Sequence, residues 1–376
     1  MSWQGIQGHD DVVERFRRSL VRGRLATTFL FVGPPGIGKH TFALKLAQSL
    51  LCPSVTERLP ERLEPCGHCA SCALAAAGTH PDLLRVAKPT DKNVIPVELL
   101  IGDDDHRMTE GLCHDIALKP FMGGRRIAII DDADVLDMYQ AVSANALLKT
   151  LEEPPPHSVL ILIGTSIDRQ LPTIRSRSQI IRFRPLDEEV LAALLVAQGE
   201  AAAPDEARRL ARYSQGSLSR AKELADPALW DFRRQLLERL SQPRLESVQL
   251  GKLTGAFIDA AGKEAPPRRA RARQIVAFAV EFYRQVCRAL CGAAPSDDAE
   301  LAGQVNASLA AWRGDAETAA ACADRTLEAL SHIDRNANQG AWIDGWLDDL
   351  AQLTSRSSWP SGGIRSSVRE TQARAT

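Results

Sequence analysis

A glycine-rich segment near the N-terminus contains residues that could bind phosphate. Gly33, Gly36, Gly38 and Lys39 follow an apolar run at 29–32 and precede a helical pattern of apolar residues. Glycines permit a tight turn whose backbone N–H groups point inward, and a lysine at a helix start adds its charge to the helix dipole. This is the pattern G-x-x-x-x-G-K-[ST] between a strand and a helix, which predicts a phosphate loop.

The residue after this lysine departs from the pattern. His40 stands where a hydroxyl normally faces magnesium, and the hydroxyl of Thr41 comes one position later. The segment still predicts the phosphate-loop fold. For binding, two alternatives stay open: the loop holds ATP with Mg2+, or it keeps the fold without a working ATP site.

Carboxylates follow a second apolar run. Residues 126–130 suit a central parallel strand that helices cover on both faces, and Asp131, Asp132 and Asp134 come directly after it. Ligands of doubly wound sheets bind beyond these carboxyl ends. Asp131 is therefore expected to hold a metal shell, and Asp132 stands where a glutamate usually polarises the attacking water. Aspartate is one methylene shorter, which argues against hydrolysis, and an acidic end that only caps the next helix is the alternative.

Four cysteines have the spacing of a metal site. Cys66, Cys69 and Cys72 are separated by two residues each, and Cys52 precedes them. Such spacing places sulfurs on one tight turn, and a fourth thiolate completes a tetrahedron. We predict a structural Zn2+ site without an open ligand position. Reduced thiols without a metal are the alternative.

Composition limits the class of protein. The 376 residues suffice for two or three domains, with 44% hydrophobic and 25% charged residues. No apolar run approaches the ~18 residues of a membrane span, and the polar N-terminus resembles no signal peptide, so a cytoplasmic protein without membrane contact is expected. Because the net charge is -1, nucleic acid would need a local basic patch. Eight cysteines indicate metal or buried thiols rather than disulfides.

The elements that carry these residues alternate between strand and helix. This alternation runs over 29–183 and predicts an α/β domain with a parallel sheet. Beyond it the chain is helical, with three short helices and then longer ones whose apolar stripes suit a helix-bundle core. These helices are expected at 187–198, 204–213 and 217–225, and within 229–352.

Two charged segments allow more than one interpretation. The acidic residues at 102–105 could bind a metal, although a solvated turn is the simpler explanation. The arginines of 266–273 could touch nucleic acid or acidic partners, but blocks of like charge commonly stay in solvent.

Three further motifs carry a resemblance to a known family. They are the helix and proline run at 144–156 (Ala-Asn-Ala-Leu-Leu-Lys-Thr-Leu-Glu-Glu-Pro-Pro-Pro), Thr165-Ser166 at a strand end, and Ile-Arg-Ser-Arg-Ser at 174–178. With the phosphate loop and the cysteines, their order resembles bacterial DNA polymerase III clamp-loader subunits of the AAA+ superfamily. The delta-prime type is most similar and the gamma/tau type second. The specific motifs cover about residues 5–225.

The resemblance implies a three-domain chain that works in an assembly. Its partners would be other clamp-loader subunits (gamma/tau and delta) in a hetero-pentamer, the sliding clamp, and primer-template DNA reached through the complex. The implied fold is a RecA-like AAA+ domain over 1–185 with an inserted zinc module at 52–72, a three-helix lid at 186–227 and an all-α collar at 228–352. Residues 353–376 are rich in Ser, Arg and Gly, and this composition predicts a disordered tail.

The resemblance also implies roles for single residues. Lys39 would contact the β- and γ-phosphates, Thr41 or His40 would face magnesium, and Thr165 would sense the γ-phosphate. Asp131 and Asp132 would be the acidic pair. Arg177 matches the arginine finger that reaches a neighbouring subunit's ATP site, where a guanidinium neutralises charge on the transferred phosphoryl group.

Departures from the family's motor subunits favour a stator of the delta-prime type, with weak or absent ATPase activity of its own. His40 and Asp132 replace residues used in hydrolysis, and Arg220 lies one position after the usual second-sensor arginine. None of these changes affects a finger acting on a neighbour. The alternatives are a gamma/tau-like ATP-hydrolysing motor and, more remotely, a zinc-containing nucleic-acid-binding protein.

Overall fold

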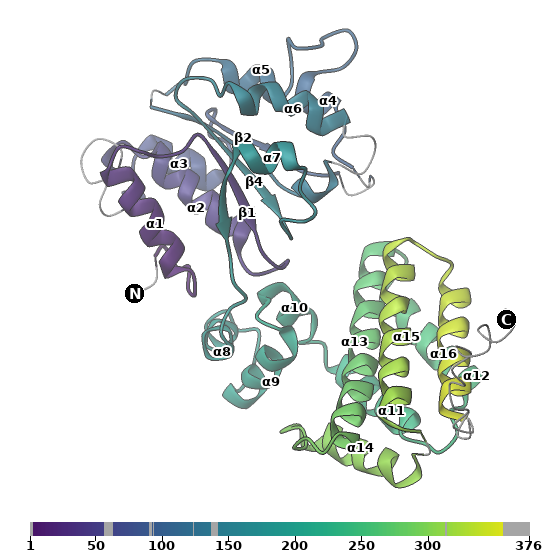
Figure 1. The fold of residues 1–376 in the computed structure, drawn as a ribbon. Coiled ribbons are helices and arrows are strands. Elements are labelled where there is room, and N and C mark those ends of the chain that lie inside the picture. The colour runs from purple at the N-terminus through teal and green to yellow at the C-terminus, as the bar shows by residue number, and fades with distance from the viewer. Residues whose placement is uncertain are drawn as a thin grey trace, which may run out of the picture. The chain divides into compact units, whose positions relative to one another are not determined.

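The computed structural model divides the chain into two compact units, residues 1–225 and 226–376 (Figure 1). The structure describes residues 3–55, 63–89, 92, 94–122, 124–136, 142–312 and 314–355. Part of the predicted zinc module and nearly all of the predicted tail at 353–376 therefore lie outside the described residues. The boundary follows Ala225, and the limits of a separate lid and collar stay predictions.

The first unit is built on one sheet of five parallel strands, in the order β2-β3-β4-β1-β5. This confirms the predicted α/β domain with a parallel sheet. The strands are β1 (Thr28–Val32), β2 (Leu83–Val86), β3 (Arg126–Ile130), β4 (Ser158–Gly164) and β5 (Gln179–Arg182). Because the strands are parallel and β3, β4 and β1 follow one another in the sheet, their carboxyl ends lie together at one edge.

Helices cover both faces of the sheet (Figure 1). Side chains alternate along β1, so Phe29 and Phe31 pack towards α1 and α2 whereas Leu30 and Val32 pack towards the opposite helices. On the first face lie α1 (Asp10–Val21), α2 (Lys39–Leu51) and α3 (Ala70–Ala77); on the second lie α4 (Glu98–Ile101), α5 (Leu112–Ala117), α6 (Val142–Glu152) and α7 (Pro172–Arg177). A short 3-10 helix, η2 (Ala133–Val135), follows β3.

Three short helices complete the first unit at the expected places. They are α8 (Glu188–Ala197), α9 (Pro204–Ser214) and α10 (Leu218–Glu223). The backbone N–H of Leu186 donates to the carbonyl of Gly216 at 3.0 Å, which ties the entry of α8 to the turn before α10.

The described part of the second unit is all helical. Its helices are α11 (Pro227–Leu240), α12 (Ser247–Asp259), α13 (Ala265–Leu290), α14 (Ala299–Ala311), α15 (Ala316–Asp334) and α16 (Gln339–Ser355). Helix α13 packs along α15, and α12 along α16. The apolar stripe that the sequence predicts on α13 is buried, as in Ile275 and Phe282. Of the described residues, none belongs to a helix apolar and long enough to span a membrane.

The arginines at the start of α13 have partners within this unit. Arg271 donates to Asp226 at 2.7 Å and lies over the ring of Phe257, and Arg273 donates to Asp334 at 2.6 Å. Arg268 and Arg269 likewise contact Asp259 and Asn336. These arginines therefore join α13 to neighbouring helices through contacts at the surface, where the Arg273 side chain stays 48% exposed.

Candidate nucleotide-binding site and cysteine cluster

The phosphate loop connects β1 to α2. Gly33, Gly36 and Gly38 have positive φ angles of 156°, 74° and 96°. A Cβ atom on Gly33 would lie 2.5 Å from the carbonyl oxygen of Phe183, just after β5. Glycine is therefore required here by the backbone conformation and by the close approach of the neighbouring chain.

A cavity of about 330 Å³ opens beside this loop, at the carboxyl ends of β3 and β4. It brings together most of the residues that the sequence predicts for the site and adds others. The predicted residues that line it are Gly36, Gly38, Lys39, His40, Thr41, Asp131, Asp132 and Thr165. The additional residues include Asp134 and, from α10, Leu218, Ser219 and Lys222. The volume and the mixed charges suit a phosphorylated ligand.

Lys39 is buried at the start of α2, with 6% of its surface exposed. Its Nζ atom donates to the carbonyl oxygens of Gly33 and Pro34, each at 2.6 Å. Burial lowers the pKa of this ammonium group, while Asp131 and Asp134 counter part of the effect. The loop therefore holds a preorganised cation next to the first N–H groups of a helix, a combination that binds anions.

The residues opposite the lysine do not fit Mg2+. Nδ1 of His40 lies 2.7 Å from Oδ2 of Asp131, and the backbone N–H of Asp132 donates to Oδ1 of Asp131 at 3.0 Å. Burial opposes ionisation of Asp131, but these hydrogen bonds, first that of His40, hold its pKa below the ordinary value. Mg2+ requires oxygen ligands in near-octahedral geometry. Here an imidazole has replaced the hydroxyl and already binds the carboxylate.

Asp134 has a positioning role that the sequence reading did not assign. Its carboxylate accepts the backbone N–H of Thr165 at 2.8 Å and the hydroxyl of Thr165 at 2.6 Å. Gln170 donates to the same carboxylate. Asp134 thus links the ends of β3 and β4 and orients the threonine towards the cavity. The repeated aspartates after the strand were the available signal, but they do not say which carboxylate faces inward.

The start of α10 lies against the phosphate loop. The carbonyl of Gly36 accepts the backbone N–H groups of Leu218 at 2.9 Å and Ser219 at 3.4 Å. Lys222, which the sequence reading missed, lines the cavity one turn later and donates to Glu200 at 2.8 Å. Arg220 instead donates to Gln215 at 2.9 Å. Ser219 therefore lines the cavity, whereas Arg220 is not among the described residues that line it.

We expect Gly36→Ala to release α10 from the loop. A Cβ on Gly36 would lie 2.8 Å from the Cβ of Ser219 and closer still to Ser217, and φ of 74° adds roughly 1–2 kcal/mol of strain. Faster amide hydrogen exchange across α10 is expected. Gly23→Ala is the matched control, because Gly23 has φ of 62° but open space around its position. Equal exchange in the two variants would contradict the contact.

Arg177 ends α7 and, within the described part of the chain, is not among the residues that line the cavity. Its guanidinium donates to Glu152 of α6 at 2.6 Å and to the carbonyl of Thr173 at 3.1 Å. About 32% of the Arg177 side chain is exposed, against 50% for Glu152. The arginine is therefore held at the surface of the unit, where a second molecule can reach it.

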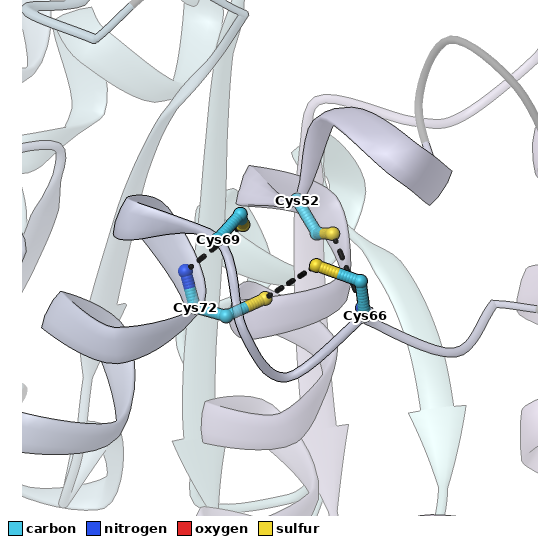
Figure 2. Close-up of side chains that lie close together, drawn as sticks. All are labelled: Cys52, Cys66, Cys69 and Cys72. Carbon is cyan, nitrogen blue, oxygen red and sulfur yellow. Dashed lines mark hydrogen bonds between the residues drawn. The ribbon is translucent and has the colours of Figure 1, made fainter.

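The four predicted cysteines lie together (Figure 2). Cys52 follows the end of α2, Cys69 and Cys72 lie at the start of α3, and Cys66 comes from the segment between these helices. Their sulfur atoms all lie within 4.8 Å of one another. A tetrahedral zinc with Zn–S bonds near 2.3 Å has sulfur–sulfur distances of about 3.8 Å. The cluster therefore fits a metal ion of this kind.

The thiols of the cluster differ in their pKa values. Backbone N–H groups, first that of His68, lower the pKa of the Cys66 thiol to about 6. Burial raises the pKa values of Cys69 and Cys72. Thiols in such surroundings ionise when a cation binds them, since the thiolate is the ligand. Ser71 connects α3 to the end of α2 and to the segment before β2 through hydrogen bonds with Leu51 and His80.

Comparison with known proteins agrees with this geometry. The model of the family described as "DNA polymerase III, delta subunit" matches residues 8–187. DNA polymerase III subunit delta' (delta-prime) of Pseudomonas aeruginosa is 34% identical over 237 residues, which are 63% of this chain and 67% of the relative. The chain belongs to the DNA polymerase III clamp-loader family. This confirms the resemblance that the motifs indicate.

Within the clamp-loader family, the similarity to the delta-prime subunit of Escherichia coli extends further along the chain than the similarity to the tau subunit of the same organism. The delta-prime subunit of Escherichia coli is 29% identical over 303 residues, covering 80% of this chain and 84% of the relative. The tau subunit of Escherichia coli is 31% identical over 229 residues, but these cover only 32% of its length. This clamp-loader subunit is therefore most like the delta-prime type.

Proposed function

We propose that this clamp-loader subunit is a stator, which supplies Arg177 to a neighbouring subunit's ATP site and hydrolyses little or no ATP itself. The observation that carries the proposal is the separation of the two functions in space. The chain's own cavity has His40 in place of the usual magnesium-facing hydroxyl, and this histidine is bound to Asp131. Arg177, by contrast, lies at an exposed helix end outside that cavity.

The pocket residues take roles that follow from their chemistry. Lys39 and the N–H groups around Gly36 and Gly38 would hold phosphates, with Gly33 shaping the turn. Thr165, oriented by Asp134, would face the terminal phosphate. Thr41 lies beside His40 at the same edge. Asp131 and Asp132 are the acidic pair of the family, although the bond from His40 removes Asp131 from its usual task.

The subunit would act within a hetero-pentamer that also contains gamma/tau and delta subunits. In this proposal α8–α10 form the lid and the helical unit after Ala225 forms the collar that joins the ring. The assembly would place a sliding clamp on primer-template DNA with energy from ATP. The similarity to delta-prime and tau subunits supports these partners.

The cysteine cluster would hold a structural Zn2+ ion through Cys52, Cys66, Cys69 and Cys72. Four thiolates leave no ligand position for substrate, so the ion would stabilise the fold and take no part in a reaction. It would hold α3 to the end of α2, on the α1–α2 face of the sheet.

ATP turnover distinguishes a stator from a motor. We expect the purified full-length chain to show no turnover above background, and to raise turnover when added to its gamma-type and delta partners. A chain that hydrolyses ATP alone, and loses that activity with Lys39→Ala, would instead be a gamma/tau-like motor. The arginine contacts on α13 count against the alternative of a nucleic-acid-binding protein, because the arginines are already engaged.

A further inference from the structure

The cavity retains the groups that bind phosphate, but His40 replaces the usual metal-facing hydroxyl and contacts Asp131 at 2.7 Å. Lys39 is buried and fixed by two loop carbonyls, and it stands at the first turn of a 13-residue helix. Lys222 adds a second ammonium group from α10. These cations and N–H groups can bind a nucleotide's phosphates directly, since each contact is a charge-assisted hydrogen bond.

Two of the three carboxylates of the cavity, those of Asp131 and Asp134, accept hydrogen bonds from the protein. Asp131 accepts from His40 and from the backbone of Asp132. Asp134 accepts from Thr165 and Gln170. Asp132 has a left-handed backbone with φ of 54°, just after the strand end. The oxygens that a metal shell would use therefore already have hydrogen-bond partners at two of the three positions.

His40 has the geometry of a substitute for the metal. An ionised carboxylate can only accept, so Nδ1 of His40 must donate in the 2.7 Å contact with Asp131. The N–H thus satisfies the carboxylate, as a bound metal water otherwise would. About 47% of the His40 side chain stays exposed, so the ring edge remains accessible beside Lys39.

We propose that this cavity binds a nucleoside di- or triphosphate without Mg2+, with the imidazole of His40 in the metal's place. The inference rests on the proposed function, because a stator would use a bound nucleotide at most to maintain its own conformation and would not hydrolyse it. The ligand of the site would be the nucleotide without a bound metal ion. Lys39 and the loop N–H groups carry the phosphate contacts, and His40 keeps Asp131 from repelling them.

The test measures binding of ADP and ATP to the full-length chain by calorimetry, with excess MgCl2 or with EDTA. For the wild type we expect dissociation constants that agree within about twofold in the two conditions. His40→Ser restores the hydroxyl of the phosphate-loop pattern and frees Asp131. We expect this variant to bind about tenfold or more tightly with Mg2+ than with EDTA. Lys39→Ala is expected to lose binding in both conditions.

His106→Ser is the matched control. His106 also has Nδ1 bonded to an aspartate, 2.9 Å from Asp103, but it lies outside the cavity. This variant should bind like the wild type. Thermal unfolding of each variant confirms that it is folded.

Three results would overturn the inference: wild-type binding that Mg2+ tightens by about tenfold or more, absence of wild-type binding in both conditions, or a folded His40→Ser variant that stays indifferent to Mg2+. Each concerns the isolated chain's own cavity. None of them bears on Arg177, whose effect is measured as ATP hydrolysis at the neighbouring subunit's site. Failure of this inference can therefore be distinguished from failure of the stator proposal.

Discussion

Arg177→Ala is expected to lower ATP turnover by the reconstituted clamp loader about 10³-fold or more at the site that this chain completes. A guanidinium supplied by a neighbouring subunit neutralises charge that develops on the transferred phosphoryl group. Alanine removes that charge and leaves the fold intact, because the side chain lies at the surface and contacts mainly Glu152 and its own helix. The measurement is single-turnover hydrolysis by the complex, with assembly verified by gel filtration.

Arg175→Ala provides the control for this result. Arg175 lies on the same short helix, is exposed, and changes the net charge equally. It should leave turnover within about twofold of the wild type, as expected of a surface substitution away from the reacting groups. Arg177→Lys should recover little of the lost rate, since lysine lacks the planar fork that contacts two phosphate oxygens. Normal turnover in an assembled Arg177→Ala complex would contradict the stator proposal.

Removal of metal from the cysteine cluster is expected to destabilise the first unit by about 4 kcal/mol when free zinc is a thousandfold above its dissociation constant. The ion would join the end of α2 to the start of α3 and to the segment between them, where the sulfur atoms otherwise make weak contacts such as that between Cys66 and Cys72 at 4.0 Å. Chelation should therefore lower the unfolding temperature of this unit and expose the segment near Cys66 to protease. The helical unit after Ala225 should keep its protection.

Two variants distinguish the effect of losing the metal from the effect of losing a thiol. Cys72→Ser removes a predicted metal ligand, and Cys291→Ser removes a thiol outside the cluster. Cys72 is buried in the cluster, whereas Cys291 is exposed at the end of α13. Elemental analysis should find about one zinc per chain in the wild type and in Cys291→Ser, and much less in Cys72→Ser. A protease pattern that stays the same after verified zinc removal would show that the cluster has no structural role.

Local patterns in the sequence determined the elements of the first unit. An apolar run predicted the strand at 126–130, and the structure places β3 there. The glycine pattern predicted the turn before Lys39, because positive φ angles demand glycine. The cysteine spacing likewise predicted the cluster, since residues close in the chain must lie close in space. The short helices α4 and α5 were not predicted, because segments this short carry little periodicity.

Only the tertiary structure decided how the site works. The order of strands in the sheet brings the end of β3 next to the start of α2, and this places Asp131 within 2.7 Å of His40. The same folding puts Ser219 and Lys222, rather than Arg220, at the cavity. It also holds Arg177 against Glu152 and away from the chain's own phosphate loop. Sequence spacing specifies contacts within a turn or a helix, but pairing across the sheet depends on packing of the whole unit.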